Sequence, residues 1–260
     1  MFLQILLSII ILVIFIVIFY KTDNSQSDIL KSNLQLVEKF SKNELTFNII
    51  KKPNTNIVNF QSFYDISVFP QLQKINYKII KNEFFDYQQK SNNDWIDWAE
   101  LDLWKNNKNS SWKIIPLMAF GNWSPKNKTI FPETVKQLEK INGLVSAGFS
   151  KLGSNTTLAL HKGWGNLSNN VLRCHLGISV PVNKCSIFVI GNSYDKMIQK
   201  EGKWIIFDDS LYHSASNEDE KIDRIVLILD IKRPEHIPFG ISDVKESDEL
   251  LKFLTEFNKN

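Results

Sequence analysis

Arginine, histidine and cysteine are scarce in this chain of 260 residues. Three arginines, four histidines and two cysteines occur, whereas lysine, asparagine and isoleucine are abundant. Cys174 and Cys185 are too few for a disulfide scaffold, and no CxxC or Cys/His spacing indicates a zinc site. Because lysine carries almost all of the positive charge, an arginine is expected where lysine would not serve, as in a planar two-point contact with a carboxylate.

Several motifs of catalysis and nucleotide binding are also absent. There is no dinucleotide-binding GxGxxG, no phosphate-binding P-loop and no GxSxG nucleophile elbow. A triad of Ser210, His213 and Asp208 can be drawn, but three residues crowded at one strand end rarely reach the required geometry. With a net charge of +3 and no dense basic run, the sequence gives no reason to expect nucleic-acid binding.

The first twenty residues form a long apolar run with no charged side chain before Lys21. About 20 such residues match the thickness of a bilayer. The lack of a basic leading region and of a small-residue cleavage site favours an uncleaved anchor over a signal peptide. We therefore expect a single-pass membrane protein with an N-terminal transmembrane helix at 1–20 and a polar tether at 21–65. The lysines after the span favour a cytoplasmic body.

The later part of the chain has the pattern of β-structure. From about residue 144, short apolar runs alternate with turn residues. The runs are 145–152, 157–161, 171–182, 185–190, 203–209 and 224–232. This pattern predicts an antiparallel sandwich or barrel. We expect one folded domain at 66–236 with its β core at about 144–234, a helix at 131–142 and a C-terminal tail at 237–260.

Two histidines fall at the edges of predicted strands. His161 ends one strand, and His213 lies just past another. In a closed antiparallel sandwich distant strands face each other, so both imidazoles can point into one cavity. Imidazole is a ligand for iron, zinc, copper and nickel. The alternative is that each is an ordinary surface histidine.

Two arginines lie beside apolar runs. Arg173 sits within 171–182 and Arg224 opens 224–232. An unpaired guanidinium there would be costly to bury, whereas its planar fork can hold a carboxylate through two hydrogen bonds. A dicarboxylate ligand near a metal would explain both residues. The alternative is an ordinary buried salt bridge with Asp208, Asp209 or Asp230.

His175 follows Arg173 by two residues. In a strand, residues i and i+2 share one face, so Arg173 and His175 point the same way and Cys174 points the opposite way. A basic pair facing inward on a central strand favours an anion site.

Several blocks in this region, taken in order, resemble the aspartyl/asparaginyl β-hydroxylase family. They are HKG at 161–163, LRCHLGISVP at 172–181, the P-x3-C of Pro181 and Cys185, EGKWIIFDDS at 201–210, and the D-x-x-x-P of Asp230 and Pro234. The match covers about residues 110–235 and keeps both order and spacing. The resemblance implies a double-stranded β-helix, or jelly roll, with flanking helices. It also implies a dioxygenase that uses Fe(II), 2-oxoglutarate and O₂.

The resemblance also implies roles for individual residues. His161 and His213 would bind Fe(II), and Arg224 would hold one carboxylate of 2-oxoglutarate, so these three would be the catalytic set. The other cosubstrate positions would be Arg173, His175, Ser150 and Trp112, the last in a W-x8-G match with Gly121. The position that carries a metal-binding carboxylate in most oxygenases of this superfamily is Gly163 here, as in this family, so water would fill the third site.

The family's chemistry implies hydroxylation of an Asp or Asn side chain in a peptide or protein. The arrangement of an N-terminal anchor followed by a short catalytic region is instead similar to that of the lipid A hydroxylases. A membrane lipid acyl chain is therefore the alternative substrate. A second alternative is an inactive, membrane-anchored binding module.

The segment 164–170 makes the loop between His161 and Arg173 longer than in the family, which bears on substrate specificity. Asp208 and Asp209 would orient a metal-binding histidine or simply form a turn. Trp95, Trp98 and Trp104 are expected to pack in the core or at an interface rather than to take part in catalysis.

Overall fold

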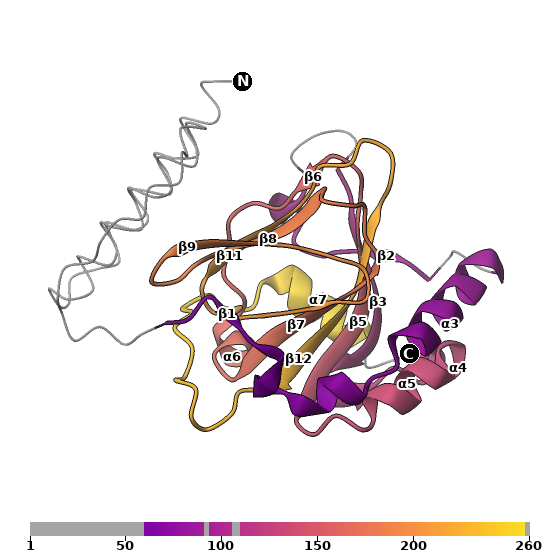
Figure 1. The fold of residues 1–260 in the computed structure, drawn as a ribbon, viewed down its shortest axis with the longest axis horizontal. Helices are drawn as coiled ribbons and strands as arrows, with labels where there is room; N and C mark the ends of the chain where they lie inside the picture. Colours follow the sequence, from indigo (N-terminus) through magenta and orange to yellow (C-terminus); the bar gives the residue numbers. More distant parts are fainter. Residues whose placement is uncertain (1–59, 91–93, 106–109, 258–260) are drawn as a thin grey trace, which may run out of the picture. The chain divides into compact units, whose positions relative to one another are not determined.

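The computed structural model describes residues 60–90, 94–105 and 110–257 (Figure 1). The expected transmembrane helix and nearly all of the expected tether lie outside these ranges. Within them, no helix is long and apolar enough to cross a bilayer.

The described part of the chain is built on two antiparallel sheets that face each other (Figure 1). The larger sheet has the order β1-β10-β7-β12-β5-β3-β2, with β4 paired to β3. Its strands are β1 (Phe63–Tyr64), β2 (Ile96–Asp97), β3 (Trp112–Ala119), β4 (Asn122–Trp123), β5 (Leu144–Leu152), β7 (Val171–Ser179), β10 (Trp204–Phe207) and β12 (Arg224–Lys232). The smaller sheet has the order β6-β11-β8-β9. Its strands are β6 (Thr156–Thr157), β8 (Cys185–Ile190), β9 (Tyr194–Ile198) and β11 (Tyr212–Asn217).

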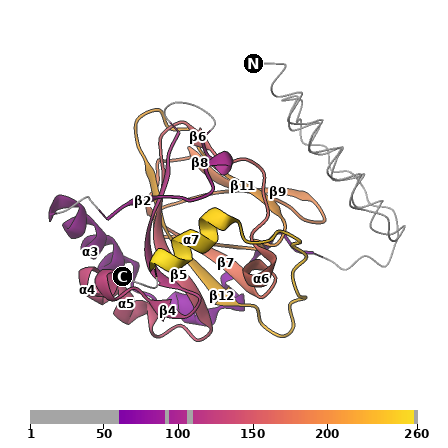
Figure 2. The same ribbon diagram turned by 180° about the vertical axis from the view of Figure 1, so that it is seen from behind.

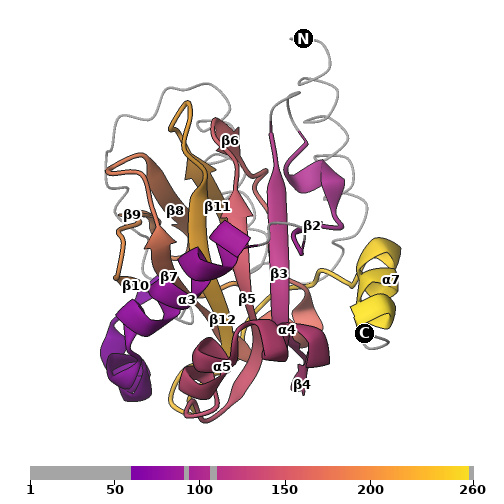
Figure 3. The same cartoon turned by 90° about the vertical axis from the view of Figure 1, so that its right-hand side faces the viewer.

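Helices cover the large sheet and its ends (Figure 3). They are α3 (Tyr77–Lys90), α4 (Pro125–Ile130), α5 (Pro132–Leu138), α6 (Gly165–Ser168) and α7 (Asp248–Phe257), with short 3-10 turns η1 (Ile66–Val68), η2 (Pro70–Lys74) and η3 (Leu101–Leu103). α3 packs Phe84 against Phe149 of β5, with ring centroids 4.7 Å apart. Seen from behind, α7 lies on the other side of the domain, where Leu250 joins Trp164 and Leu167 in one apolar cluster (Figure 2).

Strand alternation separates an apolar face from a polar one on the central strand β7. Leu172, Cys174 and Leu176 belong to the main core under the helices. Arg173 and His175 occupy the alternate positions, so their side chains leave the opposite face of the strand. The same side of the large sheet faces the small sheet, and chemistry-bearing side chains therefore collect between the two sheets.

The expected mainly β fold, with two antiparallel sheets and flanking helices, is confirmed. β8 and β12 have the bounds expected for 185–190 and 224–232, and α5 falls within the expected helix at 131–142. The strand expected at 157–161 is wrong for most of its length, because only Thr156–Thr157 is a strand. β1 lies in the segment expected as a tether, yet it pairs with β10. α7 lies in the segment expected as a tail.

Candidate metal and anion site

His161 and His213 lie side by side between the sheets. His213 is not past a strand, as expected, but is on β11, and His161 joins it through an isolated antiparallel bridge. The two backbones exchange N–H···O bonds of 3.0 and 2.8 Å. The ring centroids are 4.2 Å apart. The backbone pairing therefore brings together two imidazoles that are distant in the sequence.

Hydrogen bonds fix the tautomer of both rings. The Nδ1–H of His161 donates to the carbonyl oxygen of Ala159 at 2.7 Å, and that of His213 donates to the carbonyl of Leu211 at 2.9 Å. A carbonyl only accepts, so each Nδ1 carries the proton and each Nε2 has a free lone pair. Burial lowers the pKa of His161 to about 3 and that of His213 to about 4, so both rings are neutral at pH 7.

Asp209 places a carboxylate at this pair. Its Oδ1 lies 3.2 Å from His213 Nε2, and its Oδ2 has no hydrogen-bond partner among the described residues. A Cβ built on Gly163 would overlap that Oδ2. The glycine thus leaves the space that the Asp209 carboxylate occupies. A lone pair and a carboxylate oxygen repel each other at this distance unless a proton or a cation lies between them.

These donors suit a metal ion with open coordination positions. Two neutral imidazoles with free Nε2 atoms are a good donor set for iron, and a carboxylate beside one of them adds negative charge. The described ranges contain no group of three or more His, Cys, Asp or Glu side chains arranged to hold a metal. An ion bound by the histidine pair would therefore take further ligands from water or from a small molecule.

Arg173 is held by two carboxylates. Its Nε and Nη2 donate to Asp230 at 2.8 and 3.1 Å, and its Nη1 donates to Asp209 at 2.5 Å. Burial raises the pKa of both Asp209 and Asp230, and Arg173 opposes that shift. The structure therefore has the salt bridge that the sequence left open as an alternative. Arg173 orients Asp209, and its fork is occupied by protein carboxylates.

Arg224 has a different environment. It is 1% exposed, and no carboxylate pairs with it in the part of the chain that the structure describes. Its Nη1 donates to Gln199 Oε1 at 3.3 Å and its Nη2 to Ser150 Oγ at 3.4 Å, while its Nε has no partner within the described ranges. Burial lowers its pKa to about 10, so the guanidinium stays charged at neutral pH. A buried cation without an anion fits a site for an anionic ligand.

Two more polar side chains, Trp112 and His175, join the network around Arg224. The Trp112 indole donates to Ser150 Oγ at 3.0 Å. Gln199 Nε2 lies 3.2 Å from His175 Nδ1. His175 Nε2, like Arg224 Nε, is buried and has no partner among the residues described. Of the expected cosubstrate positions, Trp112, Ser150, His175 and Arg224 thus form one network.

Phe207 joins this anion cluster to the histidine pair. Its ring centroid lies 5.2 Å from that of His175 and 5.4 Å from that of His213. Trp112 makes a second link, with its ring centroid 6.4 Å from that of His161. The histidine pair and the cluster around Arg224 are therefore connected through two aromatic side chains.

Asp208 and Trp98 support the structure around the site. Arg233 binds Asp208 through two bonds of 2.7 and 2.8 Å, and Asp208 accepts from Ser210, which shapes the turn before His213. Trp98 stacks on both Trp112 and Trp164, with centroids 4.8 and 5.5 Å away. These contacts fix the walls of the site.

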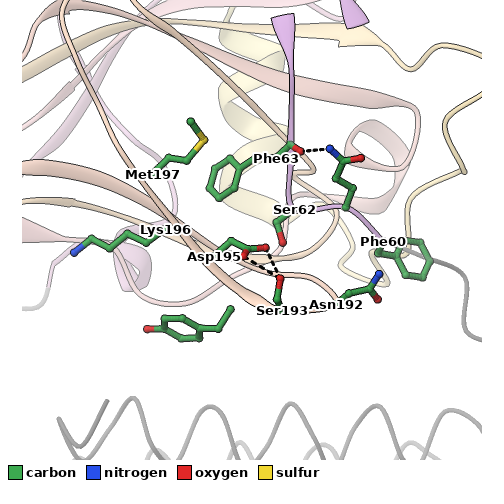
Figure 4. A pocket seen from close by; sticks show the side chains of 10 residues that line it. Phe60, Ser62, Phe63, Asn192, Ser193, Asp195, Lys196 and Met197 are labelled. Carbon is green, nitrogen blue, oxygen red and sulfur yellow. Dashed lines mark hydrogen bonds between the residues drawn. The ribbon is translucent and has the colours of Figure 1, made fainter. Parts of the chain in front are cut away.

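A surface pocket of about 560 Å³ lies between residues 60–63 and 192–197 (Figure 4). Ser193 donates to the carboxylate of Asp195 there. None of the expected metal or anion residues lines this pocket. The pocket is therefore separate from the cluster of His161, His213 and Arg224.

Gln199 is the member of the network that the sequence did not indicate. It follows the last residue of β9 and belongs to no motif, and a buried glutamine has no signature in a single sequence. Asp209 was named from the sequence, but its contact with His213 depends on the turn held by Asp208.

Comparison with known proteins agrees with these features. The profile of the family described as aspartyl/asparaginyl beta-hydroxylase matches residues 74–234. An ornithine lipid ester-linked acyl 2-hydroxylase of Rhizobium tropici is 37% identical over 131 residues, which cover 49% of this chain and 43% of that protein. A human aspartate beta-hydroxylase domain-containing protein 2 is 30% identical over 141 residues, covering 50% of this chain and 36% of that protein. The chain thus spans less than half the length of these curated relatives.

Among solved structures, a prolyl-4-hydroxylase of Pseudomonas putida is 9% identical and superposes with a TM-score of 0.40. The superposition covers 61% of this chain and 88% of that one. At that score, the family assignment depends on the sequence comparisons.

Proposed function

This chain belongs to the aspartyl/asparaginyl β-hydroxylase family of Fe(II)/2-oxoglutarate oxygenases, and from that premise we propose that it hydroxylates the acyl chain of a membrane lipid. Fe(II) would be its metal, 2-oxoglutarate its cosubstrate and O₂ its oxidant. The apolar segment 1–20 would bring the domain to its substrate as a single-pass anchor.

The observation that carries the proposal is the buried guanidinium of Arg224. Within the described ranges it has no carboxylate partner, and its polar network is linked to His213 through Phe207 and to His161 through Trp112. A protein maintains such a charge at a cost of several kcal/mol, roughly, unless a ligand supplies the anion. A dicarboxylate that reaches from the histidine pair to Arg224 meets this requirement.

Each side chain has a definite task in this proposal. His161 and His213 would hold iron through Nε2, since each Nδ1–H is committed to a backbone carbonyl. Arg224 and the Ser150 hydroxyl would hold the far carboxylate of 2-oxoglutarate. Asp209, fixed by Arg173, would accept a hydrogen bond from a water molecule beside His213. When bound, iron and 2-oxoglutarate supply the oxidation: O₂ is consumed, 2-oxoglutarate becomes succinate and CO₂, and one oxygen atom enters a substrate C–H bond.

The choice of substrate depends on the relatives. The Rhizobium tropici protein, named for an acyl 2-hydroxylase activity on an ornithine lipid, shares 37% identity with this chain. The proteins named for an aspartate beta-hydroxylase domain share 29–30%. The lipid alternative is therefore better supported than the Asp or Asn side chain that the sequence first favoured.

The test is succinate formation from 2-oxoglutarate by the full-length protein with Fe(II), in the presence of either an aminoacyl lipid or an Asp/Asn-containing peptide. We expect the lipid to stimulate turnover and to gain the mass of one oxygen atom on its acyl chain. His213→Ala should abolish both. Stimulation by the peptide alone would favour side-chain hydroxylation. Absence of iron binding would favour an inactive binding module.

A further inference from the structure

Gln199 lies at the centre of the anion cluster without belonging to any recognisable motif. It is 3% exposed, and its backbone N–H donates to the carbonyl of Cys185 at 2.9 Å, which extends the β8–β9 ladder by one residue. Its side-chain amide lies between Arg224 Nη1, at 3.3 Å, and His175 Nδ1, at 3.2 Å. One amide thus touches both basic groups.

The orientation of this amide follows from the chemistry of its neighbours. A guanidinium only donates, so the oxygen of Gln199 must face Arg224. The amide NH₂ of Gln199 then faces His175. Because the amide nitrogen only donates, His175 Nδ1 must accept. A neutral imidazole that accepts at Nδ1 carries its proton at Nε2. Gln199 therefore determines the tautomer of His175.

The tautomer of His175 decides whether its Nε2, on the opposite side of the ring, donates or accepts. His175 Nε2 is buried and has no hydrogen-bond partner in the described ranges, and the same is true of Arg224 Nε. Ser150 Oγ accepts from both Trp112 and Arg224, which leaves its own hydrogen for another group. With the proton on Nε2, all three groups are donors. With the proton on Nδ1, His175 would present a lone pair to an anion and repel it.

We propose that Gln199 is a positioning residue of the 2-oxoglutarate site, which holds His175 as the Nε2–H tautomer so that the imidazole donates to the bound dicarboxylate. This inference rests on the proposed function for the identity of the ligand. The role of Gln199 in setting the tautomer rests on the contacts alone and can be measured without iron or cosubstrate.

The experiment is ¹⁵N NMR of the full-length protein labelled at histidine. The chain has four histidines, so the ring signals can be assigned by single substitution. We expect an Nε2–H signature for His175 in the unmodified protein. In Gln199→Glu, the carboxylate accepts on both sides, and His175 should change to the Nδ1–H form. In Gln199→Met, the preference should weaken, and KM for 2-oxoglutarate should rise by about tenfold with a smaller change in kcat.

Gln137→Met is the matched control. Gln137 is another buried glutamine, 6% exposed, and accepts a hydrogen bond from the Asn76 backbone far from this network. Its substitution also removes a buried amide, yet should leave the His175 tautomer and KM unchanged.

The outcomes separate the two claims. An Nδ1–H tautomer in the unmodified protein, or no change in Gln199→Glu, would overturn the role of Gln199 even if 2-oxoglutarate binds. An Nε2–H tautomer with no binding of 2-oxoglutarate would overturn the proposed function and support only the tautomer assignment.

Discussion

His213 Nε2 lies 3.2 Å from Asp209 Oδ1, and neither atom carries a proton that it could donate to the other. The proton of His213 is on Nδ1, where it donates to the Leu211 carbonyl, and Asp209 Oδ1 accepts from Arg173. Two acceptors that face each other at this distance in a buried site favour a cation that both atoms contact. The proposed binding of a metal by the pair therefore involves Asp209 as well as the two imidazoles.

The first prediction concerns Asp209→Asn. An amide NH₂ at this position would donate to His213 Nε2 and block its lone pair, so we expect iron affinity to fall by roughly ten- to a hundredfold. Anaerobic Fe(II) titration of the full-length protein measures it. Asp230→Asn is the control, because Asp230 also binds Arg173 but does not contact His213. Equal iron affinity of Asp209→Asn and the unmodified protein would show that Asp209 has no part in metal binding.

The second prediction concerns Gly163→Ala. The added methyl group would meet the Asp209 carboxylate and the Ser168 Cβ, neither of which can move freely, since Arg173 holds one and α6 holds the other. We expect a loss of stability of about 1–3 kcal/mol and weaker iron binding. Urea unfolding and iron titration measure the two effects. A variant with unchanged stability and iron affinity would show that the carboxylate does not need this space.

The sequence predicted the mainly β fold because β5, β7, β8, β10 and β12 are apolar runs with turn residues between them. It did not predict β11, whose residues YHSASN are mostly small and polar. This segment is a strand because it pairs with β8 on one side and β6 on the other, which is a tertiary effect that local pattern does not record. It also did not predict β3, where Pro116 and the preceding polar stretch hide the strand.

In the candidate site, too, some features were predicted from the sequence and others depend on tertiary structure. The positions of His161, His213 and Arg224 were expected from spacing and from resemblance, and the structure brings them into one region. The partners of Arg173 could not be identified from the sequence, because Asp208, Asp209 and Asp230 were all possible salt-bridge partners. The register of β7 with β12 sets Arg173 opposite Asp230, and its register with β10 pairs Arg173 with Phe207, two residues before Asp209.

The third prediction concerns pH and the metal-free protein. Burial lowers the pKa of His213 to about 4, below the value of 6.5 for an exposed histidine, so the unfolded state binds the proton more readily. Stability from this residue is complete above pH 6.5 and is lost as the pH falls toward 4. The loss is on the order of 3 kcal/mol for such a shift.

Urea unfolding without metal, measured between pH 4 and pH 7, tests this dependence. His213→Gln should reduce this dependence and leave the part that is due to His161, whereas His236→Gln, a change at an exposed histidine, should leave it unchanged. An unfolding free energy of the unmodified protein that does not fall in this range would contradict the burial of a neutral His213.

The last prediction separates the two arginines between the sheets. Arg173 is paired with two buried carboxylates, so Arg173→Met leaves both without a partner and should cost roughly 3–5 kcal/mol of stability. Arg224 has no such partner among the described residues, so Arg224→Met removes a buried charge that the apo protein must tolerate. We expect Arg224→Met to leave the unfolding temperature unchanged or raised without ligand, while 2-oxoglutarate no longer stabilises it. Thermal unfolding with and without 2-oxoglutarate measures both. If Arg224→Met destabilises the apo protein as much as Arg173→Met does, then Arg224 has a structural partner, and the anion site must be placed elsewhere.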